Sequence, residues 1–82
     1  MHFIYILQSE KDKSYYVGEA PNIEDRLIFH NKGLQRYTRA RMPWKIVYSE
    51  KYENRKEALK REKEIKRKKS KKYIEWLIKK QK

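Results

Sequence analysis

The sequence predicts an α+β fold in which a small three-stranded antiparallel sheet is flanked by helices, in the order β-β-α-β-α-α. Three observations predict it: two strand-like segments lie within residues 2–18, a third alternates apolar and polar residues over 44–49, and the rest of the chain carries helix-capping signals. The 82 residues contain no internal repeat and no dividing linker. We therefore expect one domain spanning residues 1–82.

The first two strands form a predicted β-hairpin. Residues 2–7 are a nearly continuous apolar run, typical of a buried central strand, although a buried helical segment has the same pattern. After a polar break at 9–13, residues 14–18 resume strand character. A basic, irregular connection at 34–43 has room for a short helical turn. The alternation over 44–49 then predicts a strand with one strongly apolar face.

Capping residues delimit three helices. Asn22 opens a helix over about residues 23–32, and Gly33 ends it, because glycine accepts the left-handed backbone that closes helices. Asn54 opens a second helix to about residue 68, and Ser70 opens the last one. The last helix has an apolar stripe at helical spacing, made of Tyr73, Ile74, Leu77 and Ile78.

The net charge of +12 is concentrated in the C-terminal third. Residues 1–53 carry nine Lys/Arg against seven Asp/Glu, a net +2, whereas residues 54–82 carry fourteen against four, a net +10. A one-sided basic surface attracts polyanions such as phosphate backbones. A solvated, lysine-rich helix face has the same composition, so the charge favours a nucleic-acid partner and names no reaction.

The composition excludes several classes of site. There is no cysteine for a disulfide or a thiolate zinc site. Two glycines cannot build a phosphate-binding loop, and two histidines without a Gly-x-Ser-x-Gly turn give a serine triad little support. No apolar run is long enough to span a membrane, and the start lacks the build of a signal peptide, so we expect a cytoplasmic protein.

Glu62 is the most informative polar residue. It lies four residues after Ala58, three after Leu59 and three before Ile65, so it faces inward with the apolar side of its helix. A carboxylate in that position costs free energy unless it is paired or bound to a cation. From the spacing alone, a salt bridge with a nearby arginine is favoured over a metal site.

Four further side chains have both a structural and a chemical interpretation. Arg26 either pairs with a neighbouring acid or binds phosphate and stabilises charge during phosphoryl transfer. His30, one turn on at the same edge of the apolar stripe, is either a proton carrier or a polar cap on the core. Tyr5 and Tyr16 lie on adjacent predicted strands, where tyrosine is ordinarily half-buried packing. Only the set points to chemistry.

A series of short motifs runs in order along nearly the whole chain: Phe3-Ile4-Tyr5, Tyr16-Val17-Gly18, Asn22 to Leu27, His30-Asn31, Tyr37 to Tyr48, and Ala58 to Lys66. Either three-letter motif alone is weak, but the ordered series is specific. The series resembles the GIY-YIG nuclease superfamily, and the stretch over 37–48 resembles its short single-domain bacterial branch.

The resemblance implies a three-stranded antiparallel sheet with flanking helices, and hydrolysis of DNA phosphodiesters with one divalent metal ion. By position, Glu62 is similar to the metal-binding glutamate and Arg26 to the catalytic arginine. Tyr5 and Tyr16 are similar to the paired tyrosines that position or deprotonate the attacking water. His30 stands where relatives carry histidine or tyrosine near the scissile phosphate. With one protein ligand, Mg²⁺ or Mn²⁺ would be weakly held.

Two positions depart from the family pattern. Phe3 replaces the glycine of the first motif, which concerns local packing because the functional member of that motif is Tyr5. Glu19 follows Gly18 where some repair-nuclease relatives carry lysine. An acid there removes a cation from the site and is expected to weaken catalysis or alter substrate choice.

We therefore expect a metal-dependent DNA endonuclease that is structure-selective or weakly sequence-specific. Salt-sensitive contacts with the DNA backbone are expected from Arg36, Arg39, Arg41, Lys68, Lys69, Lys71 and Lys72. The alternative is a nucleic-acid-binding module that keeps the fold without cutting, which Glu19 favours modestly. A third interpretation, a basic protein-interaction adaptor, would gain from an exposed Trp76 or from binding that resists high salt. The sequence predicts no membrane partner and no small-molecule cofactor, and it leaves the oligomeric state open.

Overall fold

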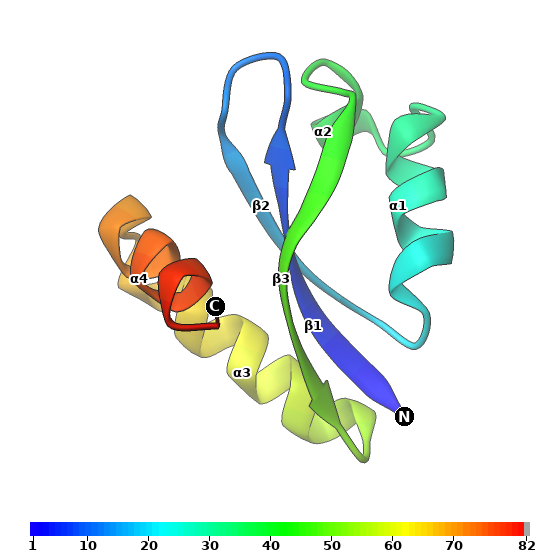
Figure 1. The fold of residues 1–82 in the computed structure, drawn as a ribbon. Helices are drawn as coiled ribbons and strands as arrows, with labels where there is room; N and C mark the ends of the chain where they lie inside the picture. Colours follow the sequence, from blue (N-terminus) through cyan, green and yellow to red (C-terminus); the bar gives the residue numbers. More distant parts are fainter. Residues whose placement is uncertain (82) are drawn as a thin grey trace.

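The computed structural model describes residues 1–81 and has the predicted order of elements (Figure 1). The strands are β1 (His2–Ser9), β2 (Tyr15–Ala20) and β3 (Trp44–Tyr52), joined in one antiparallel sheet of order β2-β1-β3. Lys82, the last residue of the predicted domain, lies outside the described residues. No helix within residues 1–81 is long and apolar enough to cross a membrane.

Helices cover both faces of the sheet. Those described are α1 (Ile23–Asn31), α2 (Arg36–Arg39), α3 (Arg55–Lys68) and α4 (Lys71–Gln81). In Figure 1, α3 and α4 lie on one side of the strands and α1 lies on the other. The short α2 is the helical turn that the sequence allowed within the basic connection at 34–43.

The capping residues set the helix boundaries as predicted. Asn22, Asn54 and Ser70 each accept a hydrogen bond from the backbone N–H three residues on, at 3.0, 3.0 and 3.2 Å. Gly33 has a φ of +72° and donates its N–H to the carbonyl of His30 at 3.1 Å. That bond and the left-handed backbone end α1 as the sequence predicts.

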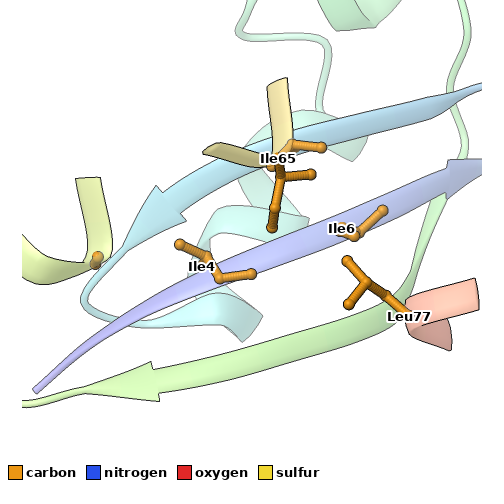
Figure 2. Packing of buried hydrophobic residues seen from close by; sticks show 6 residues of the cluster. Ile4, Ile6, Ile65 and Leu77 are labelled. Carbon is orange, nitrogen blue, oxygen red and sulfur yellow. The ribbon is translucent and has the colours of Figure 1, made fainter. Parts of the chain in front are cut away.

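The central strand β1 is buried on both faces, which explains its almost continuous apolar sequence. Its Ile4 and Ile6 point toward α3 and α4, where they meet Ile65 and Leu77 (Figure 2). All four side chains are essentially inaccessible to solvent. This cluster fixes α3 against the sheet, and α3 carries Glu62.

The opposite face of the sheet holds a second cluster that includes Tyr5, Leu7, Ile23 and Trp44. Tyr5 pairs with Gly18 across the β1–β2 register. A Cβ at Gly18 would overlap the Tyr5 hydroxyl and the ring carbon that bears it. The absence of a side chain at Gly18 is therefore what allows the Tyr5 ring to lie across β2.

A polar cluster ties β3 to α3 and α4. Arg61 donates from Nε and Nη2 to the two carboxylate oxygens of Glu50, at 2.8 and 3.0 Å, and from Nη1 to the Tyr73 hydroxyl at 3.2 Å. The hydroxyls of Tyr48 and Tyr52 also donate to Glu50. Burial would raise the pKa of Glu50, but these donors outweigh it and hold the pKa below its usual value.

Candidate active site

Residues from β1, β2 and α1 meet beside the edge strand β2. The rings of Tyr5 and Tyr16 have centroids 6.5 Å apart. The His30 ring packs edge-on against Tyr16 at 5.0 Å and lies 6.1 Å from Tyr5. Three of the five predicted catalytic residues therefore form one aromatic cluster.

A directed chain of hydrogen bonds runs behind this cluster. The Thr38 hydroxyl donates to the Gln35 carbonyl at 3.4 Å, so its oxygen accepts from His30 Nδ1 at 2.8 Å. With its proton on Nδ1, His30 offers Nε2 as an acceptor to the Tyr5 hydroxyl at 3.1 Å. This series of hydrogen bonds assigns the His30 proton to Nδ1 and directs the Tyr5 hydroxyl proton toward His30 Nε2.

Burial holds Tyr5 and His30 in their neutral forms. It raises the pKa of Tyr5 to about 12, against the opposing influence of the Arg26 guanidinium. Burial likewise lowers the pKa of His30 to about 4, and the charge of Arg26 contributes to that fall. At neutral pH, Tyr5 keeps its proton and His30 accepts a hydrogen bond without gaining one.

His30 is fully buried, which fits the expected polar cap on the core better than an exposed proton carrier. Periodicity identified the correct helix face but not its depth. Both ring nitrogens are hydrogen bonded, which removes much of the cost of burying a polar ring. His30 therefore lies behind Tyr5 rather than on an open surface.

Arg26 carries an unsatisfied donor at the same site. Its guanidinium lies over the Phe29 ring, 4.3 Å from the centroid. Its Nε is buried and has no hydrogen-bond partner among residues 1–81. Arg26 is also close enough to Tyr5 and His30 to influence the pKa of both. A buried N–H without an acceptor is costly, and a phosphate oxygen would satisfy it.

Glu62 is a partly buried carboxylate on α3. Its side chain is 16% exposed, and its Oε2 accepts from Lys66 Nζ at 2.9 Å. Lys66 Nζ also lies 5.9 Å from the centroid of the Tyr16 ring, and after burial the charge of Glu62 contributes to the raised pKa of Tyr5. The sequence allowed an arginine as its partner, but the partner is a lysine one turn along the same helix.

The carboxylate of Glu62 suits a weakly held, hard cation. Within residues 1–81, no group of three or more His, Cys, Asp or Glu side chains could hold a metal ion. Any ion here would take one carboxylate from the protein, with water and phosphate completing its shell. That donor set fits Mg²⁺ or Mn²⁺, which commonly bind through one or two carboxylates and substrate phosphates.

Glu19 lines a cleft that Arg26 also lines. This cleft has a volume of about 370 Å³, and its lining includes His2, Glu19, Arg26 and Arg55. Glu19 accepts from His2 Nδ1 at 2.6 Å and lies 3.5 Å from Arg55 Nε. The acid that stands where some relatives carry lysine is therefore paired, and Arg55 brings a cation into the same cleft from α3.

Comparison with known proteins shows the family of this chain. The family model of the GIY-YIG catalytic domain matches residues 1–81. The chain belongs to the GIY-YIG family. Membership places it in a superfamily of nucleases.

Proteins similar to this GIY-YIG chain occur in several bacteria. A UPF0213 protein of Staphylococcus saprophyticus is 50% identical over 66 residues, which cover 79% of each chain. One from Clostridium perfringens is 47% identical over 68 residues, covering 82% of this chain and 72% of its own. The solution NMR structure of a UPF0213 protein from Bacillus halodurans matches with a TM-score of 0.60 and 32% identity, covering 95% of this chain and 82% of that one.

The basic residues expected to contact DNA lie in two parts of this GIY-YIG fold. Arg36 and Arg39 are exposed on α2, while Arg41 lies 3.4 Å from an oxygen of Asp12. The lysines around the junction of α3 and α4 are also exposed: Lys68, Lys69, Lys71 and Lys72. Because these side chains are exposed, they are accessible for the expected phosphate contacts.

Trp76 is 54% exposed on α4. Its ring stacks on Tyr73 with centroids 5.9 Å apart, and Lys80 Nζ lies 5.0 Å from its centroid. An exposed Trp76 is the feature that favours the protein-interaction interpretation. The lysines beside it suit a nucleic acid equally well, so this face does not separate the two.

The sequence analysis did not identify four residues of the candidate site. Thr38 and Gln35 orient His30, Lys66 pairs with Glu62, and Arg55 pairs with Glu19. The Glu62–Lys66 pair could have been predicted from the sequence, because a glutamate and a lysine four residues apart on a helix are neighbours. The other three pairings depend on the tertiary fold and leave no periodic trace.

Proposed function

We propose that this chain is a divalent-metal-dependent endonuclease that hydrolyses DNA phosphodiesters in a structure-selective or weakly sequence-specific manner. The observation that carries the proposal is the position of Arg26 and Glu62. Both are close enough to Tyr5 to influence the pKa of its hydroxyl. A buried, unsatisfied guanidinium donor and a carboxylate thus both act on the Tyr5 hydroxyl, and a phosphodiester with its cation would neutralise both.

Glu62 would hold the metal ion, and Arg26 would bind the phosphate. When bound, the ion supplies an electrophile for a phosphate oxygen and acidifies water. Arg26 offers its free Nε–H to a phosphate oxygen and balances the charge that develops on phosphorus. Hydrolysis then adds hydroxide to phosphorus, breaks one P–O bond and leaves a proton for the departing oxygen.

We assign Tyr16 to the attacking water. It is partly exposed, and its hydroxyl accepts from Gln35 Nε2 at 3.3 Å, so its own proton is free to bind water or a phosphate oxygen. Tyr5 and His30 are buried and neutral, which suits a role in positioning. In this assignment His30 holds the Tyr5 hydroxyl, and Tyr5 presents its oxygen to the site.

The non-cleaving binding module has one specific observation in its favour. Lys66 already neutralises Glu62, the carboxylate that the metal needs. If the lysine held that position in the presence of DNA, the protein would bind nucleic acid through its basic surface without cutting it. The two candidates differ in whether a divalent ion displaces Lys66.

Cleavage assays on labelled duplex, single-stranded and branched DNA, with Mg²⁺ or Mn²⁺, test the proposal. Glu62→Ala and Arg26→Ala are compared with Glu64→Ala and Arg67→Ala, which remove like charges from exposed positions of α3. We expect both site variants to lose cutting while DNA binding persists, and both controls to cut normally. Salt-sensitive binding without cutting of any substrate would instead establish the binding module.

A further inference from the structure

A cleft of about 440 Å³ opens beside the candidate active site. Its volume falls within the range of small-ligand pockets, about 300–1,000 Å³. Tyr16 belongs to both sites, and Lys66 links the cleft to Glu62. Aromatic rings and one amide dominate its walls, which are formed by Tyr15, Tyr16, Val17, Gln35, Tyr37 and Lys66.

Tyr37 gives the cleft an open aromatic wall. The side chain comes from α2 and is 68% exposed, although its ring centroid lies 6.1 Å from that of Tyr16. Most of the Tyr37 ring therefore faces solvent. A flat ligand such as a nucleobase would stack on such a ring whatever its sequence, because every base has a π-face.

Gln35 supplies an unused acceptor. Its Nε2 donates to the Tyr16 hydroxyl at 3.3 Å, while its Oε1 is buried and has no partner within residues 1–81. A buried amide oxygen without a donor is uncommon and costly in a folded protein. An N–H on the edge of a base entering the cleft would satisfy it.

The charges around the cleft match a nucleotide. Lys66 lines the cleft, and its Nζ lies 5.9 Å from the Tyr16 ring centroid. Arg36 is exposed next to Tyr37 on α2. A flat ring, a hydrogen-bond donor on its edge and a neighbouring negative charge are the three features of a nucleotide in a strand.

We propose that this cleft binds one unpaired nucleobase of the substrate, adjacent to the phosphodiester that is cut. The base stacks on Tyr37 and donates an N–H to Gln35 Oε1, while Lys66 faces its phosphate. The inference rests on the proposed function, because it deepens the description of that substrate. It makes an exposed base, rather than the duplex alone, part of what the protein recognises.

Fluorescence anisotropy in the presence of a chelator tests the proposed base pocket. It compares two single-stranded oligonucleotides of equal length and charge, of which one has mixed bases and the other is wholly abasic. The wild type should prefer the strand with bases by roughly 5- to 150-fold. Tyr37→Ala should lose most of this preference, whereas Tyr37→Phe, which keeps the ring, should retain it. Gln35→Ala should reduce it by roughly 2- to 10-fold.

Trp76→Ala is the matched control, because Trp76 is also an exposed aromatic residue. Equal binding of the two strands by the wild type, or an unchanged preference in Tyr37→Ala, would overturn the base pocket. Loss of preference in Trp76→Ala alone would assign base binding to α4 and also overturn it. Manganese-dependent cutting that Glu62→Ala abolishes decides the proposed function separately, so the two can fail independently.

Discussion

The ammonium group of Lys66 lies 2.9 Å from Oε2 of Glu62, so the carboxylate proposed to hold the metal already has a cation beside it. The two residues are one turn apart on α3, and Lys66 is the more exposed of the pair. Such pairs contribute only about 0.2–1 kcal/mol, because water screens them. In the proposed function, a divalent ion would therefore displace the lysine at small cost, and Lys66 would then be free to face a phosphate.

Lys66→Met should tighten Mn²⁺ binding in the absence of DNA. Removing the competing cation should lower the Mn²⁺ concentration at half-saturation by roughly 1.5- to 5-fold, in keeping with an ion pair of that strength. Electron paramagnetic resonance of free Mn²⁺ measures it. Lys63→Met on the same helix should leave the affinity nearly unchanged. Equal affinity in wild type and Lys66→Met would show that Lys66 does not compete for the carboxylate.

Gly18→Ala should destabilise the protein by about 2–3 kcal/mol, because the added methyl group overlaps the Tyr5 hydroxyl. The backbone of β2 cannot move away to relieve this overlap without breaking its hydrogen bonds to β1. Urea denaturation measures it. Gly33→Asn is the control, since asparagine tolerates the left-handed backbone and should cost less than about 1 kcal/mol. A Gly18→Ala protein as stable as the wild type would mean that Tyr5 does not cross β2 as described.

The buried His30 should make stability fall as the pH falls from neutral. Its pKa in the folded protein is about 4, below the ordinary 6.5, so between these values the unfolded chain binds a proton that the folded chain does not. Unfolding free energy should drop by about 2 kcal/mol between pH 7 and pH 5 from this group alone. Urea titrations of wild type and His30→Gln at both pH values measure it.

The His30→Gln variant lacks this titration, so its stability should change much less over the same interval. The pKa values of Glu50 and Asp12 are also shifted, but downward from 4.5 and 3.8, and their contributions are lost at lower pH than this window. Parallel pH profiles for variant and wild type would contradict a neutral, buried His30.

Arg61→Leu should reduce stability and leave the chemistry intact. The substitution leaves Glu50 and its tyrosine donors without their cation, at a cost of about 2 kcal/mol for a pair that is largely but not fully buried. Arg26→Ala should show the reverse, with cutting lost and the unfolding free energy nearly unchanged. Denaturation and cleavage measured on both variants separate the two arginines. Equal loss of activity at equal stability would place Arg61 in the site.

Local signals in the sequence determined the secondary structure. Caps at Asn22, Asn54 and Ser70 set where helices begin, because each must satisfy free backbone N–H groups within one turn. The apolar run of β1 identified the central strand, since a strand covered on both faces has no polar side. These effects act over a few residues, so the order of elements follows from the chain itself.

The sequence also determined which side chains carry the candidate chemistry. Motif order singled out Tyr5, Tyr16, Arg26, His30 and Glu62, and helical spacing alone showed that Glu62 faces inward. Their meeting depends on pairing β1 with β2 and on packing α1 and α3 against that hairpin.

Only the tertiary structure decided how those residues are held. Two features join residues that are apart in the sequence: the Thr38 contact that fixes the tautomer of His30, and the pairing of Glu19 with Arg55. Two others depend on burial: the inaccessibility of the His30 side chain and the lack of a hydrogen-bond partner for Arg26 Nε. Burial is a property of the whole packed chain, and it sets both the pKa values and the cost of unsatisfied groups. Periodicity therefore assigns a residue to a face, whereas packing decides whether that face is open to a substrate.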